Sequence, residues 1–310
     1  MTKGQKLNRT ITTASVVVVF MLILIGGIVR STGAGMGCPD WPKCFGKWAP
    51  DANSQLITWI EYSNRVFGAV TGLFVLAAAI TSLAWWKRDK AITILSISAL
   101  LLIGFEGLVG AKVVFKNLEE YTITVHLALA YILSGLLLVA YARINYDNQP
   151  GAGFQTNRAK NNWFTAIALA VTSMQILLGT FVRAEINTII KNNDTVTRGQ
   201  LAANAHTWLP GHRMFSGAVI LACLYIAGLY WQWGRVNKTI RFSILLMVVS
   251  LAGQFLTGTL LYSFGFPAYA QPLHILFSSL IFGGLVLLLA NNNIYGADKS
   301  AQPINRVHYA

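Results

Sequence analysis

Charged residues are scarce in this chain of 310 residues: Asp, Glu, Lys and Arg make up 11% of it, and hydrophobic residues make up 55%. The mean hydropathy is +0.53. This composition excludes an ordinary soluble domain of the same length and is typical of a polytopic membrane protein. A small-residue cleavage site is also missing after the first apolar segment, which favours a retained membrane anchor over a removed signal peptide.

A helix that crosses a bilayer needs about 20 mostly apolar residues, and eight segments of the chain meet this requirement. They are residues 11–29, 66–86, 91–114, 121–141, 163–182, 214–233, 242–264 and 272–291. We therefore predict an all-α integral membrane protein with eight transmembrane helices.

The net charge of +13 comes from basic residues that lie between the apolar segments. A cytoplasmic N-terminus places most of them on the cytoplasmic side, as the positive-inside rule requires. These residues are Lys3, Lys6, Arg9, Lys87, Arg88, Lys90, Arg143, Arg158, Lys160, Arg235, Lys238, Arg241, Lys299 and Arg306. The pattern predicts a multi-pass protein of the plasma membrane, with the lipid bilayer as a partner and both termini in the cytoplasm. Binding to nucleic acid is the weaker explanation of the charge.

The second half of the chain repeats the first at a constant distance. Polar and small residues recur 148 positions apart (213 − 65, 254 − 106, 258 − 110, 274 − 126 and 283 − 135), and "GIVRS" at 27–31 returns as "TFVRA" at 180–184, 153 positions later. The polar segment 145–162 separates the halves. We predict two four-helix bundles, residues 1–148 and 149–310, in parallel orientation about a pseudo-two-fold axis along the membrane normal.

Three of the five histidines, His126, His212 and His274, lie where apolar segments begin on the predicted outer side. A single histidine in such a position is more often a hydrogen-bonded core residue, but ionisable groups repeated at one depth indicate function. No Cys lies beside them to complete a structural zinc site. Two imidazoles on facing helices of a bundle instead suit the axial ligands of a haem iron.

The two halves differ at the positions that matter for this chemistry. Asn64 stands where the second half has His212, so the first site offers His126 alone and an open position on the iron. Glu61 corresponds to Leu209, and is either a charge at the helix N-terminus or a carboxylate that acts on the substrate.

Two further sets of side chains support the prediction of haem sites. Glu106 corresponds to Gln254, and is either a structural group or part of a proton path. Four arginines on the outer side could bind the propionate groups of a haem, because guanidinium groups bind carboxylates. Arginines at a membrane interface often only extend their charge toward the lipid headgroups. The four arginines are Arg30, Arg65, Arg183 and Arg213.

Two cysteines, Cys38 and Cys44, lie in the first outer loop, near turn-forming prolines. A disulfide between them suits an oxidising exterior compartment. It either stiffens the loop as a lid over the first site or relays electrons. The third cysteine, Cys223, is predicted to be a packing residue inside an apolar segment, and His206 of the second outer loop to lie at the surface.

Five sequence segments together resemble the haem A synthase family of cytochrome oxidase assembly proteins. They are "GGIVRSTGAGMGCPDWPKC" (26–44), "EYSNR" (61–65), "HLAL" (126–129), "PGHRMFSG" (210–217) and "LHILFSSL" (273–280). The resemblance implies an oxidoreductase with eight helices that converts a methyl group of haem O into the formyl group of haem A, for use in terminal oxidases. It also implies haem b as a cofactor, a haem O synthase as supplier of the substrate and an external electron donor.

Carried over to this chain, the resemblance assigns His212 and His274 to the iron of haem b, and His126 to the iron of the substrate haem. The family's Glu-x-x-His-Arg motif appears here as Glu61-Tyr-Ser-Asn64-Arg, so the second substrate-side histidine is missing. Two alternatives remain at this point. One is a di-haem b-type electron carrier, for which histidine pairs would have to span both leaflets; the other is a haem-binding or trafficking protein without catalysis, for which Asn64 argues.

Overall fold

The computed structural model describes residues 1–146, 158–192 and 196–297, and in these ranges the chain is helical and forms no β-strand. The long helices are α1 (Lys3–Thr32), α2 (Leu56–Ser82), α3 (Lys90–Phe115), α4 (Glu120–Asn145), α5 (Arg158–Asn192), α7 (Leu209–Val236), α8 (Lys238–Ser263) and α9 (Ala270–Ala297). Short elements are α6 (Leu201–Asn204) and the 3-10 turns η1 (Ala34–Met36), η2 (Leu83–Trp85) and η4 (Arg198–Gln200). Eight helices in the described ranges are long and apolar enough to cross a membrane, which confirms the predicted fold class.

The helices extend beyond the apolar segments that predicted them. Helix α2 begins at Leu56, ten residues before the predicted start (66 − 56), and α7 begins at Leu209 with Pro210 in its first turn. Hydropathy detects only the apolar part of a helix, whereas the hydrogen-bonded backbone continues through polar residues at a membrane interface. As a result Glu61 and Asn64 are helical residues with fixed neighbours rather than loop residues.

Polar side chains fix several helix ends. A reciprocal capping box between Thr2 and Gln5 starts α1, and Gly33, at φ 71°, ends it in the left-handed conformation that glycine adopts without strain. At the start of α3 the side chain of Asp89 accepts a hydrogen bond from the backbone N–H of Ala91. Its Oδ2 also forms an ion pair with Nη1 of Arg143, at 2.8 Å. This ion pair joins the first turn of α3 to the last turn of α4.

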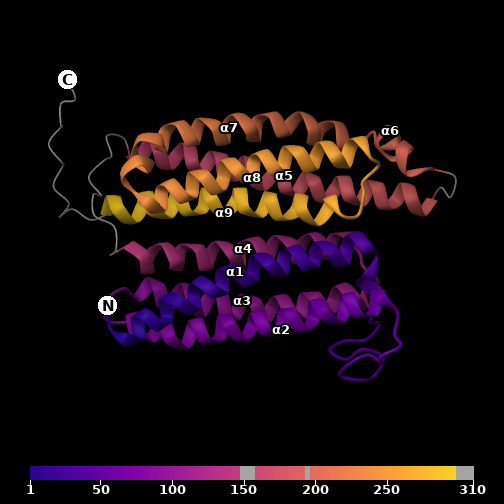
Figure 1. Cartoon of the computed structure of the whole chain (residues 1–310), viewed down its shortest axis with the longest axis horizontal. Coiled ribbons are helices and arrows are strands. Elements are labelled where there is room, and N and C mark those ends of the chain that lie inside the picture. The colour runs from indigo at the N-terminus through magenta and orange to yellow at the C-terminus, as the bar shows by residue number, and fades with distance from the viewer. Residues whose placement is uncertain (147–157, 193–195, 298–310) are drawn as a thin grey trace.

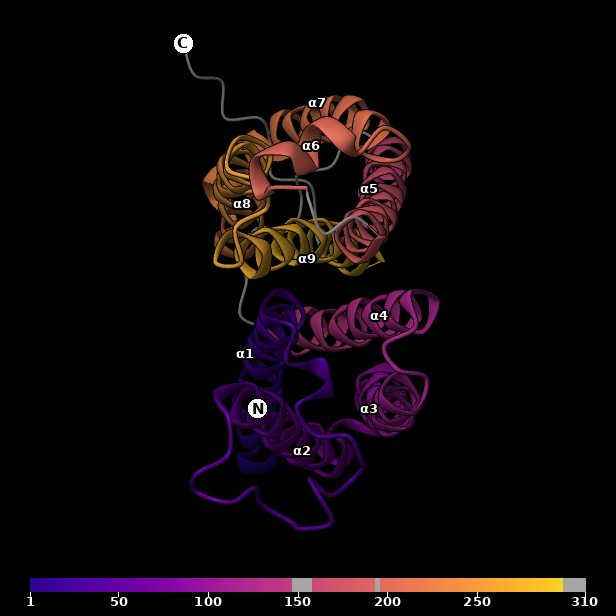
Figure 2. The ribbon, with the colours of Figure 1, turned by 90° about the vertical axis from the view of Figure 1, so that its right-hand side faces the viewer.

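The long helices form two groups of four (Figure 2). In the first group α1 packs on α2 and α4, and α3 packs on α2 and α4; in the second, α5 packs on α7 and α9, and α8 packs on α7 and α9. Across the interface α1 and α4 both contact α9, and α4 also contacts α5. The predicted boundary between the halves, at residue 148, lies outside the described residues.

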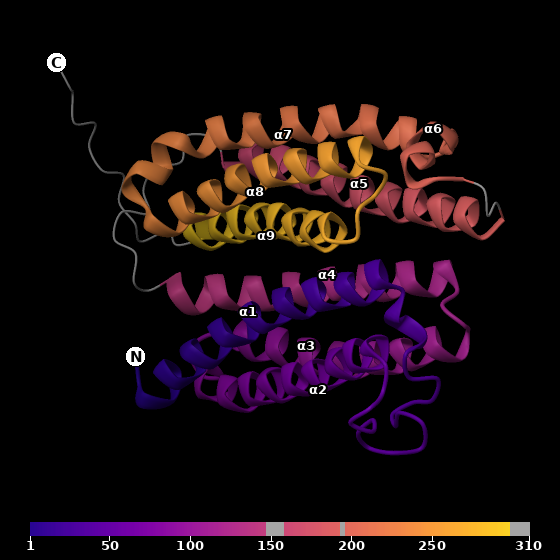
Figure 3. The ribbon, with the colours of Figure 1, turned by 45° about the vertical axis from the view of Figure 1, so that its right-hand side comes forward.

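The connections that follow α1, α3, α5 and α8 all lie at one end of the molecule (Figures 1 and 3), which we call the loop end. The N-terminus and the α2–α3 and α7–α8 connections lie at the opposite end, the terminal end. Corresponding helices of the two groups therefore run in the same direction. Histidines 126, 212 and 274 all lie in the first two turns of helices that begin at the loop end.

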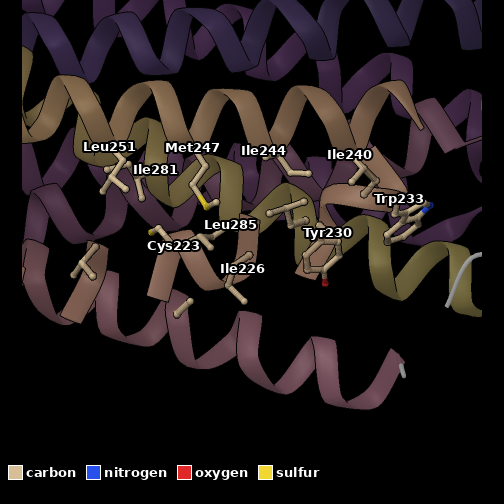
Figure 4. Packing of buried hydrophobic residues seen from close by; sticks show 13 residues of the cluster. Cys223, Ile226, Tyr230, Trp233, Ile240, Ile244, Met247, Leu251, Ile281 and Leu285 are labelled. Carbon is tan, nitrogen blue, oxygen red and sulfur yellow. The ribbon is translucent and has the colours of Figure 1, made fainter. Parts of the chain in front are cut away.

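Two hydrophobic clusters form most of the interior. One lies within the second group, where Cys223 is fully buried as predicted and contributes with Met247 and Leu285 (Figure 4). The other includes Val19 and Phe20 of α1, residues of α2, α3 and α4, and Val286, Leu287 and Ala290 of α9. Helix α9 thus completes the interior of the first group.

Candidate functional site

In the first group His126 of α4 lies against α3. Its Nδ1 is in ion-pair contact with the carboxylate of Glu106, although the pair lacks the angles of a regular hydrogen bond. A Cβ on Gly110, one turn beyond Glu106, would lie 3.5 Å from Cε1 of His126, so the ring rests on bare backbone. The side chain of His126 is 43% exposed, against 8% for Glu106. With Nδ1 turned to the carboxylate, Nε2 is the ring nitrogen that Glu106 leaves free.

The corresponding histidine of the second group, His274 of α9, has neutral partners. Its Nε2 lies 2.9 Å from Nε2 of Gln254, and its Nδ1 lies 3.0 Å from Oγ1 of Thr257. A Cβ on Gly258 would lie 3.2 Å from its Cε1. Thr257 was not predicted from the sequence; its counterpart in the first half is Val109 (257 − 148), and this difference in polarity was the available signal.

His212 lies in the first turn of α7 and faces α5. Gln175 of α5 donates a 2.9 Å hydrogen bond to the carbonyl of His212, and its Nε2 is 3.4 Å from the ring Nε2. The ring Nδ1 is buried without a hydrogen-bond partner among the described residues. His212 and His274 are close enough to interact electrostatically. Gln175 was also not predicted from the sequence. Its counterpart in the first half is the apolar Leu22 (175 − 153), and this difference in polarity was the available signal.

A glycine lies opposite each of these histidine rings. Gly179 faces His212, where a Cβ would be 3.3 Å from Cε1, as Gly110 faces His126 and Gly258 faces His274. The repeat places Gly26 (179 − 153) in the corresponding position opposite Asn64, and a Cβ on Gly26 would meet no atom within 4 Å.

Glu61 lies one turn before Arg65 on α2 and is 5% exposed. Its Oε1 is 2.8 Å from Nε of Arg65, and its charge interacts with His126. The structure thus places Glu61 within electrostatic range of His126. In the second group Leu209 offers no carboxylate, and Arg213 lies over the ring of Tyr262 instead, at 3.9 Å.

Arg65 also holds the first loop. Its Nη1 donates to the carbonyls of Asp40, at 2.5 Å, and Lys43, at 2.8 Å, and its Nη2 donates to the carbonyl of Cys38, at 2.8 Å. The predicted disulfide between Cys38 and Cys44 is present, with both residues buried. Burial favours the stiffening role over an electron relay, which needs access to a partner.

The same loop is closed by Asp40, whose carboxylate accepts hydrogen bonds from the backbone of Phe45 and Gly46, at 2.6 and 2.7 Å. The bond from Gly46, supported by the bond from Phe45 and the charge of Arg65, holds the pKa of Asp40 below its usual range.

The remaining arginines predicted at the site, Arg30 and Arg183, lie together between the two groups. Arg30 pairs with Glu120 at 2.7 Å, and Asn187 donates to the other oxygen of Glu120 at 2.5 Å. Arg183 interacts electrostatically with both Arg30 and Glu120. The Nε atoms of Arg30 and Arg183 are buried without hydrogen-bond partners in the described part of the chain.

These contacts separate the four arginines into three places: Arg65 on the first loop, Arg213 on Tyr262, and Arg30 with Arg183 at the interface. His206 is exposed, as predicted. Over residues 1–146, 158–192 and 196–297 no three side chains of His, Cys, Asp and Glu gather as a metal cluster.

Comparison with known proteins agrees with this arrangement. The family COX15-CtaA, described as "Cytochrome oxidase assembly protein", matches residues 9–286. The chain is 25% identical to "Heme A synthase" of Halalkalibacterium halodurans over 94% of this chain and 99% of that protein. It is 29% identical to "Heme A synthase" of Shouchella clausii, over 81% of this chain and 83% of that protein. The chain is thus an eight-helix membrane protein that belongs to the COX15-CtaA family of cytochrome oxidase assembly proteins.

Proposed function

We propose that this protein is a haem A synthase, an oxidoreductase that converts a methyl group of haem O into the formyl group of haem A. The observation that carries the proposal is the chemical difference between two halves of one architecture. The second half places His212 and His274 together, and the first replaces one histidine by Asn64 and adds Glu61 beside His126. The names of the relatives agree with this reading.

The second half fits haem b. His212 carries a buried ring nitrogen without a partner, as a ligand that awaits its metal does, and His274 is oriented by Thr257. Bare glycine backbone opposite both rings lets each imidazole pack closely on the neighbouring helix. His212 and His274 would hold haem b, which would supply one-electron transfer.

The first half fits a substrate that enters, reacts and leaves. His126 would anchor the haem O iron on one side, and Asn64 would leave the other side exchangeable, because an amide is a poor iron ligand but can bind water. Conversion of the methyl to a formyl group removes electrons and protons from that carbon and adds one oxygen atom, which O₂, reduced with the help of the external electron donor, or water would supply. The buried carboxylate of Glu61, held by Arg65, would accept a proton or stabilise positive charge there.

The loop end would face outward from the plasma membrane, with both termini in the cytoplasm. Basic residues at helix ends of the terminal end, among them Lys90, Arg143, Arg235 and Lys238, support this orientation. Haem O would arrive from a haem O synthase within the bilayer, and electrons from an external donor. Arg30 and Arg183, with unpartnered Nε atoms, are the arginines best placed to bind haem propionates.

Haem extraction from membranes tests the proposal. The protein is produced together with a haem O synthase in cells that make no haem A, and the extracted haems are separated by chromatography. We expect haem A to accumulate only when both proteins are present. Unchanged haem O with bound haem would point to a trafficking protein, and reduction of both haems by quinol without haem A would point to a di-haem electron carrier.

Purified protein is expected to hold one low-spin haem b that depends on His212 and His274. Replacement of either residue by alanine removes an axial ligand, so the low-spin absorption spectrum should be lost or should change to a five-coordinate form. The matched control is His206→Ala, an exposed histidine of the same half, which should leave the spectrum unchanged. Parent-like spectra in both ligand variants would refute the assignment.

The variant Asn64→His is expected to fold and to close the first site. A Cβ on Gly26, the repeat counterpart of Gly179, would meet no atom within 4 Å, so we expect the new imidazole to pack there as the ring of His212 packs on Gly179. The substrate-loaded variant should therefore shift toward six-coordinate, low-spin haem, as absorption and electron paramagnetic resonance spectra report. A parent that already shows two bis-histidine haems would contradict this account of Asn64.

A further inference from the structure

Glu106 is a buried carboxylate in an apolar helix. It is 6% exposed, and neither of its oxygens has a regular hydrogen-bond partner among the described residues. Burying a charged group without compensation costs several kcal/mol, so such a group persists where something nearby offsets the cost. The contact that the structure gives it is Nδ1 of His126.

The second half lacks this charge at the corresponding place. There an amide, Gln254, and a hydroxyl, Thr257, flank the ring of His274. The two histidines otherwise share their surroundings: both lie in the second turn of their helix, and both rest on a glycine of the preceding long helix. The rings nevertheless present different nitrogens: Nδ1 of His126 meets the carboxylate of Glu106, whereas Nδ1 of His274 meets the hydroxyl of Thr257 and its Nε2 meets Gln254. The group at Nδ1 is therefore charged in the first half and neutral in the second.

We propose that Glu106 is a positioning residue for the reaction. Its carboxylate accepts a hydrogen bond from Nδ1–H of His126, which turns Nε2 toward the iron of the substrate haem and makes His126 a stronger ligand. This inference rests on the proposed function, because it takes His126 to be the substrate-side ligand. A carboxylate behind a metal-bound histidine fixes the tautomer and raises ligand basicity. Hydrogen bonds of this kind are often poorly aligned without substrate and tighten in the complex.

A stronger donor stabilises the oxidised iron. The substrate haem should therefore have a lower reduction potential than it would have with a neutral partner behind His126, while Gln254 and Thr257 leave haem b without this effect. Glu106 thus lowers the reduction potential of the first-half haem alone, through its ligand His126, whereas Glu61 acts on the substrate directly.

Substitutions in both halves test the inference through reduction potentials. Purified full-length protein loaded with haem O is titrated spectroscopically as the parent, as Glu106→Gln and as Thr257→Asp. Glu106→Gln should raise the potential of the first-half haem by the equivalent of at least a tenfold change in the ratio of oxidised to reduced iron, about 59 mV for one electron. Thr257→Asp, which places a carboxylate beside Nδ1 of His274 and does not depend on the stability of the first variant, should lower the potential of the second-half haem. In each variant the other haem should keep its potential.

A second readout is the iron–histidine stretching frequency of the ferrous haem in resonance Raman spectra. It should fall in Glu106→Gln, because the histidine becomes a weaker donor. Potentials and frequencies that stay at the parent values in both variants, or that move equally for both haems, would overturn the positioning role. Unchanged potentials with normal haem A formation reject the inference alone, whereas shifted potentials without haem A formation by the parent reject the proposed function alone.

Discussion

Replacing Glu61 by glutamine is expected to leave haem b bound and to reduce haem A formation by ~10²–10³-fold, the range found when a group that acts on the transition state is removed. The substitution keeps the size of the side chain but removes the charge that lies near His126. Haem b should stay in place because its ligands, His212 and His274, belong to the other half. The measurements are the yield of haem A per protein in membranes and the low-spin spectrum of the purified variant.

Two controls separate the possible roles of this carboxylate. Glu119→Gln removes an exposed acid at the same end of the molecule and should form haem A as the parent does. Arg65→Ala removes the partner of Glu61 and releases the first loop. Equal losses in Glu61→Gln and Arg65→Ala would mean that Glu61 acts by holding Arg65, and a parent-like rate in Glu61→Gln would make it a helix-end charge.

The second large effect is expected for His126→Ala, which should lose conversion of haem O by at least ~100-fold, since even indirect partners of metal ligands change activity by 10–100-fold. Asn64 cannot replace the lost ligand, so the first half should no longer hold the substrate iron. The measurements are haem A yield and the number of haem O molecules bound per protein.

The low-spin haem b spectrum should persist in His126→Ala, which distinguishes loss of a ligand from loss of the fold. His206→Ala serves as the matched histidine control, because it is exposed at the same end. Normal haem A yield in His126→Ala would show that the substrate is held elsewhere.

The sequence was sufficient for the transmembrane helices and for the pairing of Cys38 with Cys44. It was sufficient because each rests on local chemistry: apolar length, and two cysteines in one short loop. The sequence did not predict the start of α2. Hydropathy is low at "EYSNR", whereas the helix already begins at Leu56 and runs through these residues.

Long-range side-chain contacts were the other limit. Arg65 was predicted to face a propionate, and the structure shows it bound to the carbonyls of Cys38, Asp40 and Lys43, a use of guanidinium that no spacing in the sequence encodes. Gln175 differs from its repeat counterpart Leu22, but that difference does not reveal the hydrogen bond that it donates to the carbonyl of His212. In both cases the partner is set by tertiary packing.

The position of α9 bears on the order in which the protein is assembled during synthesis. Val286, Leu287 and Ala290 of this last helix complete the interior shared by α1 and α4, and a Cβ on Gly27 of α1 would come within 3.0 Å of the backbone of Pro272. Because α9 follows the other long helices in the chain and also packs on α5 and α8, the face formed by α1 and α4 stays against lipid, and the second group stays incomplete, until α9 has been synthesised. A chain truncated before α9 would therefore lack His274 and leave both helix groups unfinished.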